Sequence, residues 1–476
     1  MRSTFFGIEL GKRGLMTHQA GTDITGHNVT NATTPGFSRQ SPTIVSTSPL
    51  WMPGVNPVGV AAQLGTGSAA IEVRRAENLL LNVQIRTNLA LEGRITQFES
   101  AYTQIENIFV QPDEGGLDVL LTNFFASWQA LSLAPEEDAN RVAVRQAAET
   151  IIREFHRITD TLNQYRELVN DSVLREVDRV NEIAEQIAKL NNEIARVVGT
   201  GQTPNDLMDQ RDRYLDELAS LVPVQVKRRF NESTIITVEG RVLVEDQEVR
   251  PLLAKRNWEN TGFYDVLWSD RPSVAVEPDT GAIGALQYTR DQLVPAFQAE
   301  LDLLASTLIE EVNAVHTRTV DGVPVGYGLD GLTGRDFFVG SDAGSIDLSD
   351  PIKRSTRTIQ AAEEPVAGDG LNALAIAELR WSRPLGAGTL TFDGYFQAVM
   401  ADLGAASDSI NRSLETQTKL MTQLEGLKEQ EVGVNLDEEF INLIRYEQGY
   451  NAAGRLVSTV DDMLDRLING TGRVGL

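Results

Sequence analysis

Apolar residues near the C-terminus recur at alternating spacings of three and four positions, which is the pattern of one helix face. The series is Leu443, Tyr446, Tyr450, Ala453, Val457, Val460, Leu464 and Leu467. It continues for about three and a half heptads, near the length that is typical of a coiled coil. The pattern therefore predicts a long C-terminal helix with one apolar face.

The N-terminal segment repeats this spacing with mostly small residues, at Leu10, Gly14, Thr17, Gly21, Ile24 and Asn28. Such a stripe buries too little apolar surface to form a stable core alone, but it lets a bulkier helix approach closely. Charge favours the same pairing, because residues 1–50 are weakly basic while residues 431–467 are acidic. We expect the two ends of the chain to pair as an α-helical coiled coil.

Helical periodicity also predicts a rod between the two ends of the chain. The helices expected are 1–33, 76–109, a shorter one ending near 133, 140–198, one from 203 to 222, 291–318, and most of the chain after 370. A helix over 140–198 would span on the order of 85 Å at 1.5 Å per residue. Thr203 is expected as the N-cap of the next helix, with Pro204 at its first position.

Two stretches of the chain do not read as helix. Residues 37–70 are rich in Ser, Thr, Pro and Gly, which predicts an extended or loop-like connector. Residues 224–249, 263–268 and 274–286 are short β-branched runs separated by turn residues, which predicts strands.

The order of these elements predicts a mainly α protein with a β-rich middle domain, arranged as a nested multidomain rod. The terminal helices would pair first, a helical bundle would follow, and the β domain would be inserted in it. The expected domains are 1–75 with 433–476 (terminal coiled coil and connector), 76–220 with 286–320 and 371–432 (helical rod), and 221–285 with 321–370 (β-rich middle).

Composition restricts the classes of partner. The chain has 476 residues, about three domains on the length prior, and a net charge of −25. This charge argues against nucleic acid and anionic membranes as partners, because no basic face is available to them. The absence of cysteine excludes disulfides and thiolate sites. The N-terminal segment lacks the apolar run of a secretory signal peptide, and no run reaches the ~20 apolar residues of a membrane span.

The candidate polar clusters favour structural interpretations over chemical ones. Asp206, Asp209, Asp212, Asp216 and Glu217 could in principle hold a hard cation. Arginines lie between them in the sequence, however, so we interpret them as a solvated and salt-bridged helix face. Residues 437–439 are acidic and open a helix, where carboxylates interact favourably with the helix dipole.

The remaining side chains give no recognisable catalytic or metal motif. The four histidines, His18, His27, His156 and His316, have no His or Cys neighbour at ligand spacing. Trp258, Trp268 and Trp381 could stack on sugars, but no recognisable pair of catalytic carboxylates accompanies them.

Three segments resemble known motifs of one protein family. Residues 28–40 resemble the "NNxANxxTPGYxRQ" box that the axial proteins of bacterial flagella share, with Phe37 in place of the frequent Tyr. Residues 433–440 and 443–453 are similar to the "GVNLDEEyxxLixxQqaYxAxAr" segment at the C-terminus of those proteins. Residues 205–212 resemble the "NDLLDQRD" segment of the hook-associated protein 1 family, and 281–291, 334–338 and 372–375 are similar to that family's middle region.

Two glycines depart from the pattern of the C-terminal segment. Gly449 and Gly454 stand where Gln or Ala would suit a helix better. Each costs about 1 kcal/mol of helix propensity.

The resemblance implies a structural component of the bacterial flagellum that is not an enzyme and has no cofactor. Such a protein would be secreted through the flagellar type III export apparatus and would act in flagellum assembly and motility. It would polymerise on the hook as a ring at the hook–filament junction. Its partners would be further copies of itself, the hook protein, the filament-proximal junction protein and an export chaperone at the C-terminal helix, without nucleic acid or membrane insertion.

The expected assembly interface combines the two terminal helices with the motif that follows the first. Its residues are Leu10, Thr17, Ile24, Asn28, Asn31, Pro35, Gly36, Phe37, Leu436, Phe440, Leu443, Tyr446, Tyr450, Ala453, Val457, Val460, Leu464 and Leu467.

Two alternatives remain open from the sequence. The chain could be another axial protein, either a hook subunit or the filament-proximal junction protein. Less favoured is a wall-degrading hydrolase carried in residues 221–370. The segment 205–212 and the chain length favour the hook-associated protein 1 family over both.

Overall fold

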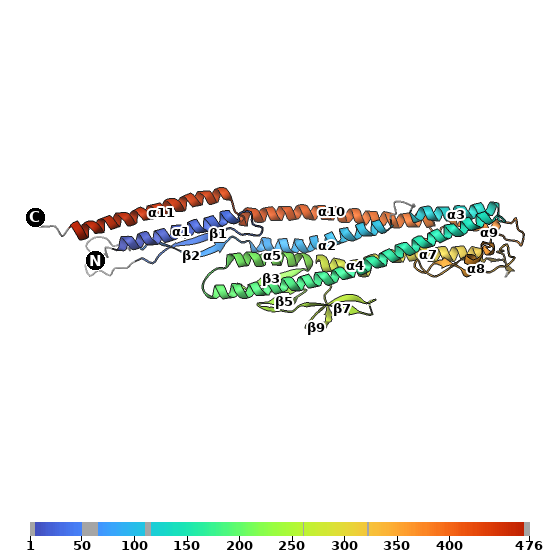
Figure 1. The fold of residues 1–476 in the computed structure, drawn as a ribbon, viewed down its shortest axis with the longest axis horizontal. Helices are drawn as coiled ribbons and strands as arrows, with labels where there is room; N and C mark the ends of the chain where they lie inside the picture. Colours follow the sequence, from blue (N-terminus) through green and yellow to red (C-terminus); the bar gives the residue numbers. More distant parts are fainter. Residues whose placement is uncertain (1–4, 50–64, 110–115, 260, 321–322, 471–476) are drawn as a thin grey trace, which may run out of the picture.

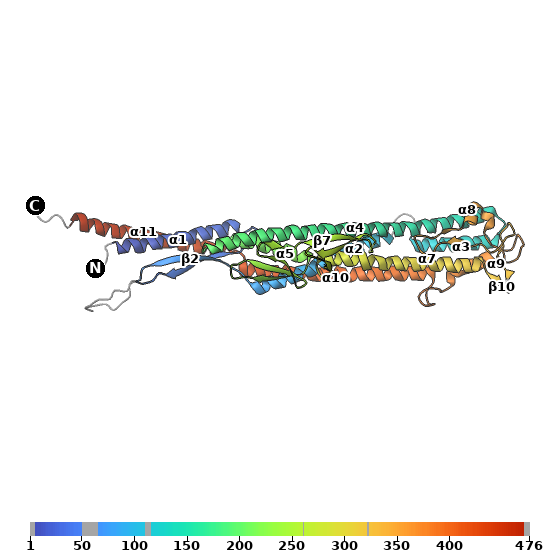
Figure 2. The same cartoon turned by 90° about the horizontal axis from the view of Figure 1, so that it is seen from below.

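The protein is a long, narrow molecule with both chain termini at the same end (Figures 1 and 2). The computed structural model describes residues 5–49, 65–109, 116–259, 261–320 and 323–470. Long helices run along its axis, and small sheets lie against the middle of the rod. The expected fold class, a mainly α nested rod with a β-rich middle, is confirmed.

The terminal helices α1 (Phe6–Asn31) and α11 (Leu436–Asp465) lie side by side, and the π-helical turn η4 (Arg466–Gly470) follows α11. Glycines form the side of α1 that faces α11. A Cβ atom on Gly7, Gly11 or Gly21 would lie 2.5–2.7 Å from the side chain of Val460, Val457 or Tyr446, respectively. These distances are too short for real contacts, so the glycines permit the close approach of the two helices. The expected pairing of the chain ends is confirmed.

A two-stranded antiparallel sheet lies along α1. It consists of β1 (Gln40–Ser46) and β2 (Ser68–Arg75), with an irregularity between Thr43 and Ile44. The hydroxyl of Thr17 on α1 donates to the carbonyl of Ser68 at 3.0 Å. The described part of residues 37–70, expected as an extended or loop-like connector, is thus extended, although its strand β1 is paired in a sheet with β2. Residues 50–64 lie outside the described residues.

The rod is built on α4 (Asp138–Gly199), a single helix of 62 residues. At 1.5 Å per residue it is about 93 Å long. α2 (Leu79–Phe109) and α10 (Phe392–Val432) lie side by side, and α5 (Asn205–Leu221) packs against both α4 and α2. Pro204, not Thr203, is the residue before the first turn of α5, and no side chain caps that turn.

The β-rich part consists of two antiparallel sheets packed on the middle of α4. One contains β3 (Val224–Arg228), β4 (Thr234–Val238), β5 (Arg241–Glu245) and β6 (Glu248–Val249). The other contains β7 (Leu252–Asn257), β8 (Phe263–Trp268) and β9 (Arg271–Ala275). The sheets share a core with Val173, Val180 and Ile187 of α4. The strand expected over 274–286 is wrong at its second half, which forms the helix α6 (Gly281–Tyr288).

The distal end of the rod has its own apolar core. It is formed by α3 (Leu117–Leu133), the first half of α4, α7 (Val294–His316) after the π-helical turn η1 (Thr289–Leu293), and the start of α10. Short elements close this end: β10 (Thr319–Val320), β11 (Val323–Pro324), β12 (Phe338–Val339), β13 (Asp347–Leu348), α8 (Asp350–Arg354), η2 (Thr356–Thr358), α9 (Leu371–Glu378) and η3 (Leu379–Trp381). Phe337, Ile352 and Ile359 pack in this core. The stretches 221–285 and 321–370, grouped in the sequence as one domain, therefore belong to different cores.

Candidate functional site at the junction of the terminal helices and the rod

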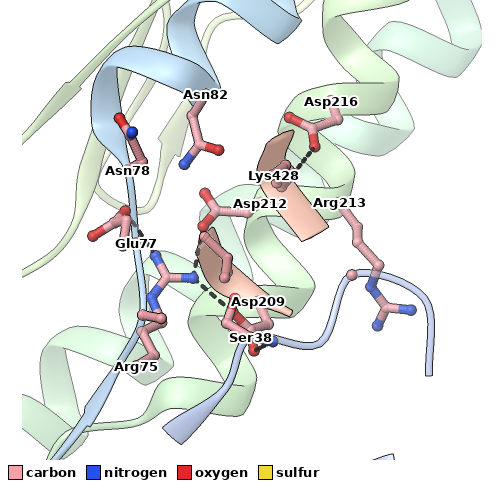
Figure 3. Close-up of a pocket in the computed structure, with 13 residues that line it drawn as sticks. Ser38, Arg75, Glu77, Asn78, Asn82, Asp209, Asp212, Arg213, Asp216 and Lys428 are labelled. Carbon is pink, nitrogen blue, oxygen red and sulfur yellow. Dashed lines mark hydrogen bonds and ion pairs between the residues drawn. The ribbon is translucent and has the colours of Figure 1, made fainter. Parts of the chain in front are cut away.

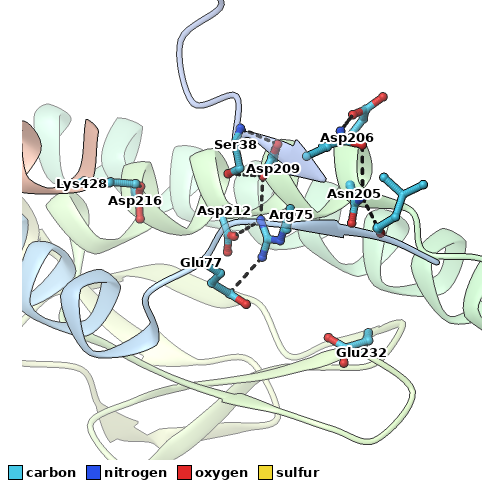
Figure 4. Close-up of polar contacts among 12 residues, drawn as sticks. Ser38, Arg75, Glu77, Asn205, Asp206, Asp209, Asp212, Asp216, Glu232 and Lys428 are labelled. Atoms are coloured by element: carbon cyan, nitrogen blue, oxygen red, sulfur yellow. Dashed lines mark hydrogen bonds and ion pairs between the residues drawn. The ribbon is translucent and has the colours of Figure 1, made fainter. Parts of the chain in front are cut away.

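The three sequence motifs meet at one place, where the terminal helix pair joins the rod. The segment after α1, the first turns of α5 and the end of β2 converge there (Figure 4). The start of α11 joins them through Glu439. We refer to the charged residues at this place, Arg39, Arg75, Glu77, Arg86, Asp209, Asp212, Asp216, Lys428 and Glu439, as the junction cluster.

Arg75, the last residue of β2, is the central cation of the cluster. Its guanidinium lies 2.7 Å from a carboxylate oxygen of Asp209, 2.7 Å from Asp212 and 3.0 Å from Glu77 (Figure 3). Only 6% of the Arg75 side chain is exposed. Burial lowers the pKa of Arg75, but the attraction of Asp212, Glu77 and Asp209 outweighs it and raises the pKa above the usual value. Arg75 is therefore a permanent buried cation.

The two carboxylates beside Arg75 respond differently to burial. Desolvation raises the pKa of Asp209, although the backbone N–H and hydroxyl of Ser38 and the Arg75 guanidinium donate to it. Desolvation also acts on Asp212, but the charges of Arg75, Arg86 and Arg211 lower its pKa overall. Charge-assisted hydrogen bonds of this kind are stronger than neutral ones. Asp212 is thus held ionised, whereas burial disfavours the ionised form of Asp209.

The cluster extends from α5 to both long helices of the rod. Arg86 on α2 lies 3.1 Å from Asp212 and 2.8 Å from Asp216. Lys428 on α10 lies 3.3 Å from Asp216 (Figure 3). Arg228 at the end of β3 pairs with Glu77. One network therefore connects β2, α2, α5, α10 and the β-rich part.

A second set of contacts ties α1 to the start of α11. The side-chain N–H of Asn28 donates to the carbonyl of Gln40 at 2.8 Å and to Glu439 at 2.9 Å. Arg39 pairs with Glu439 at 2.8 Å and with Glu438 at 2.9 Å. The backbone N–H of Arg39 also donates to the carbonyl of Val432, at the end of α10. The acidic first turn of α11 thus does more than interact with its own helix dipole, because it pairs with Arg39.

The first turn of α5 holds the β1–β2 sheet from the other side. Asn205 donates to the backbone carbonyl of Val73 at 3.0 Å. Asp206 (Figure 4) accepts from the side chain of Gln40 at 2.7 Å. It also lies 3.3 Å from a ring nitrogen of His27. The interpretation of the α5 acidic residues as a solvated and salt-bridged face is therefore right about the salt bridges of Asp209 and Asp212 but wrong about their solvation, since both side chains are largely buried.

The turn before β1 requires a glycine at position 36. Gly36 adopts a positive φ of 75°, a conformation that favours glycine. A Cβ atom there would lie 2.7 Å from the side chain of Arg213 on α5. Pro35 is exposed, and Phe37 packs edge-on against His27 with ring centroids 5.3 Å apart.

The expected interface residues divide into three groups according to their exposure in the structure. Thr17, Asn28, Tyr446 and Leu464 are buried. Partly buried are Leu10, Ile24, Asn31, Phe37, Leu443, Ala453, Val457 and Val460. Exposed are Pro35, Gly36, Leu436, Phe440, Tyr450 and Leu467. The seam between α1 and α11 is thus built within one subunit, and part of the expected interface faces outward.

Sequence reasoning missed the basic half of the junction cluster. Arg75, Arg86 and Lys428 belong to no motif, and they lie far from the α5 carboxylates in the chain. The sequence contained one indication of these cations. Several acidic residues lie on one helix that also carries buried apolar positions, and a buried carboxylate requires a cationic partner.

The junction is suited to hold structural elements together, and the space enclosed between Arg75, Asp212 and Lys428 is too small for an organic ligand. The cavity beside Arg75 has a volume of about 30 Å³ (Figure 3). That is room for water only. Within the described residues, no three His, Cys, Asp or Glu side chains are placed to hold a metal ion. Among the described helices, none combines the length and apolar character needed to cross a membrane.

The tryptophans do not form a platform for sugars. Trp268 is buried in the core beneath Arg241. Trp258 follows β7 and Trp381 lies in η3, so the two exposed tryptophans belong to different parts of the rod. The structure therefore gives no support to the hydrolase alternative.

Comparisons with known proteins agree with this arrangement. A family model described as "Flagellar hook-associated protein FlgK helical domain" matches residues 102–338. A second model, described as "Flagellar basal body rod FlgEFG protein C-terminal", matches residues 430–470. The first covers α3 to α7 of the rod with the β-rich part, and the second covers α11.

Curated relatives match over nearly the whole chain. Flagellar hook-associated protein 1 of Bacillus subtilis is 28% identical, over 99% of this chain and 99% of that protein. The protein of the same name from Salmonella typhimurium is 24% identical, over 96% of this chain and 98% of its own length.

A solved structure has a similar fold. The flagellar hook junction protein FlgK from Burkholderia pseudomallei aligns with a TM-score of 0.65 at 16% identity, over 73% of this chain and 99% of that chain. Full-length relatives, two family models and a shared fold lead to one assignment. The chain belongs to the flagellar hook-associated protein 1 family.

Proposed function

We propose that this chain is a structural subunit of the bacterial flagellum at the hook–filament junction, where it polymerises on the hook and supports filament assembly. The observation that carries the proposal is the similarity, over almost the whole length, to proteins named flagellar hook-associated protein 1. The protein is an exported axial component, and its role in motility follows from that place.

We further propose that the protein is not an enzyme. In the junction cluster, Asp209, Asp212 and Asp216 each lie against an arginine or lysine. A general acid or base needs a proton that it can exchange with a substrate. Carboxylates held by permanent cations do not meet this requirement.

The outward side of α11 near the junction is the proposed contact with neighbouring copies. Phe440, Ile441 and Ile444 are 49%, 66% and 58% exposed. Positions separated by three or four residues share a helix face, so Phe440, Ile444 and Ile441 form one apolar patch, beside the exposed Leu436. Exposed apolar patches rimmed by polar residues mark interaction sites. Residues of the seam, such as Val457, would support the interface indirectly by holding α11 on α1.

The remaining partners follow from position in the axial structure. We propose that the hook protein contacts one end of the ring and that the filament-proximal junction protein contacts the other. The terminal helices, which carry the motif shared by axial proteins, are the part of the chain best suited to both contacts.

The C-terminal helix is also the proposed binding site of an export chaperone. Besides the patch near the junction, Met463 and Ile468 are exposed at the other end of α11 and η4. An amphipathic partner can cover such residues in an apolar groove. Chaperone binding and polymerisation would then compete for one surface, which prevents premature assembly in the cytoplasm.

The assembly proposal is tested by complementing a deletion strain, which should make hooks without filaments. We expect the intact gene to restore filaments and Ile444→Asp to fail, because an unpaired carboxylate in a packed interface costs several kcal/mol. Asn451→Asp is the matched control, since it adds the same charge at an exposed polar position on the same side of α11. Filaments in the Ile444→Asp strain would remove this patch from the interface, and filaments in the deletion strain itself would refute the function.

The chaperone proposal is tested by pull-down with the cognate chaperone. A chain truncated after Val432 should lose binding, and Ile444→Asp should weaken it. Undiminished binding by the truncated chain would place the chaperone site elsewhere.

A further inference from the structure

The seam between α1 and α11 has a large side chain, His18, among the glycines of α1. Along α1, the residues that meet α11 include Gly7, Gly11, Gly14 and Gly21, and His18 stands among them. Along α11, the residues that meet α1 include Tyr446, Ala453, Val457 and Val460, and Gly449 is the α11 glycine in closest contact with α1, since a Cβ atom on Gly454 would lie 4.0 Å from Leu15. A glycine in a helix interior is unfavourable by about 1 kcal/mol, so its presence at position 449 needs a reason.

The structure brings these two exceptions together. A Cβ atom on Gly449 would lie 2.5 Å from Cε1 of His18. One turn away the relation is reversed, because the ring of Tyr446 lies where a Cβ atom on Gly21 would be, at 2.6 Å. The two rings are neighbours, with centroids 6.4 Å apart. The Nδ1 atom of His18 is buried without a hydrogen-bond partner in the described structure, so packing rather than hydrogen bonding at that atom holds the ring.

The glycines alone do not define how the two antiparallel helices align. In the observed alignment Gly14 meets Ala453, and Gly7 meets Val460. If α1 slid by one heptad, Gly14 would meet Val460 or Tyr446, and a glycine would accept either of them. His18 distinguishes the observed alignment from the displaced one, because the same slide would place its ring opposite Leu456 or Asn442 instead of Gly449. Inserting extra volume into a packed contact is destabilising.

We propose that His18 and Gly449, with the reciprocal pair Tyr446 and Gly21, determine the register of the terminal helix pair. His18 is the side chain that fits one position, and Gly449 is the only position on the α11 side that receives it among the described contacts. The glycine that is unfavourable for α11 alone thus specifies its alignment with α1. This inference concerns the isolated subunit and does not depend on the proposed function.

The register has a consequence at the junction. In the observed alignment Asn28 reaches Glu439 at 2.9 Å, and Arg39 pairs with the same carboxylate. A slide by one heptad would separate these groups and leave charges unpaired. The register also determines where along α1 the exposed Phe440 and Ile444 lie. His18 and Gly449 are therefore positioning residues for the outer surface of the helix pair.

Disulfide trapping in the full-length chain tests this proposal, because the natural sequence contains no cysteine. Gly14→Cys with Ala453→Cys reports the observed register, since a Cβ atom on Gly14 lies 3.1 Å from Cβ of Ala453. Gly14→Cys with Val460→Cys reports the register displaced by one heptad. Dilute protein is oxidised, and intramolecular cross-links are identified by mass spectrometry of the peptides.

We expect His18→Gly to lower the ratio of observed to displaced cross-link by about tenfold, the scale of an overpacked contact. Gln19→Gly is the matched control, because it also introduces a glycine into the interior of α1, at an exposed position. It should leave the ratio unchanged. The exchange His18→Gly with Gly449→His should restore the observed register, since it moves the ring to α11 and the space for it to α1.

Each outcome bears on the proposal. An unchanged ratio in His18→Gly would overturn it, and so would an equal change in Gln19→Gly. If His18→Gly abolishes both cross-links because the helices separate, recovery of the observed cross-link in the exchanged variant supports the proposal. Failure to recover it overturns the proposal.

Discussion

Replacing Arg75 by Met should open the junction while leaving the rest of the rod folded. Methionine has a similar length and can fill the space, but it leaves Asp209 and Asp212 without their shared cation. Asp212 retains Arg86 at 3.1 Å, whereas Asp209 keeps only the hydrogen bonds from Ser38. Removing one partner of a buried ion pair typically costs about 3–5 kcal/mol. With 6% of Arg75 exposed, solvent screening reduces this figure little.

Hydrogen exchange of backbone amides measures this loss at the junction itself. The N–H of Ser38 bonds to Asp209, and the N–H of Ala76 bonds to the carbonyl of Arg39. Local opening that is easier by 3–5 kcal/mol would speed exchange at both amides by about two to nearly four orders of magnitude. Amides in the distal core, such as those near Trp128, should not change.

The pH dependence of the variant gives a second measure. Desolvation already raises the pKa of Asp209 in the folded protein. A carboxyl with a raised folded pKa destabilises the fold when ionised, and this destabilisation is relieved as the pH falls towards that pKa. The defect of Arg75→Met should therefore shrink on acidification. Arg74→Met is the control, because Arg74 is exposed and pairs only at the surface with Glu72. Equal, small effects of the two variants would show that the junction cluster is not a desolvated network.

The turn and the distal core allow two further predictions. Gly36→Ala should destabilise the junction by about 1–3 kcal/mol, because Gly36 has a positive φ and a Cβ atom there would meet Arg213. Gly26→Ala should instead stabilise α1 by about 0.5–1 kcal/mol, because no atom lies within 4 Å of its Cβ position. Hydrogen exchange at the Ser38 amide measures both effects, and a change in the same direction in the two variants would contradict the reasoning. His316 donates from Nδ1 to the carbonyl of Arg335 and accepts the N–H of Gln360, and burial lowers its pKa to about 4. Since the unfolded chain protonates this group near pH 6.5, stability of the distal end should fall from there towards pH 4, by about 3 kcal/mol at most. His316→Gln, which does not titrate, should show a flatter urea midpoint against pH, and an unchanged slope would refute the assignment.

Periodicity in the sequence identified the elements that bury one continuous face. The spacing of Tyr446, Ala453, Val457 and Val460 predicts α11 and its partner, and these residues do face α1. A helix with its own repeat can be recognised without knowledge of its surroundings, because side-chain spacing alone defines its face.

The β1–β2 sheet could not be recognised in the same way. Its strands contain Ser41, Pro42 and Ser46, and their burial does not alternate. The sheet owes its place to α1 and α5, through Thr17 and Asn205, rather than to an apolar face. The short apolar run 281–288 was misassigned for another reason, because a short run fits both strand and helix.

The junction cluster was hidden because its two halves are distant in the sequence. Helical spacing places Asp209, Asp212 and Asp216 on one side of α5, but it gives no information about Arg75 and Arg86. The same holds for Gly449, whose only visible property in the sequence is an unfavourable helix propensity. Its reason lies on another helix, in the ring of His18.

The contact between Asn28 and Glu439 joins residues separated by 411 positions. Closing a chain loop of that size costs on the order of 5 kcal/mol in conformational entropy. The first and last segments can therefore meet only after the whole chain is present, and the rod between them must already hold their attachment points near each other. A chain that ends before α11 would keep α1 without its partner and Arg39 without Glu439. The contacts of the junction can therefore form completely only in a molecule that contains both α1 and α11.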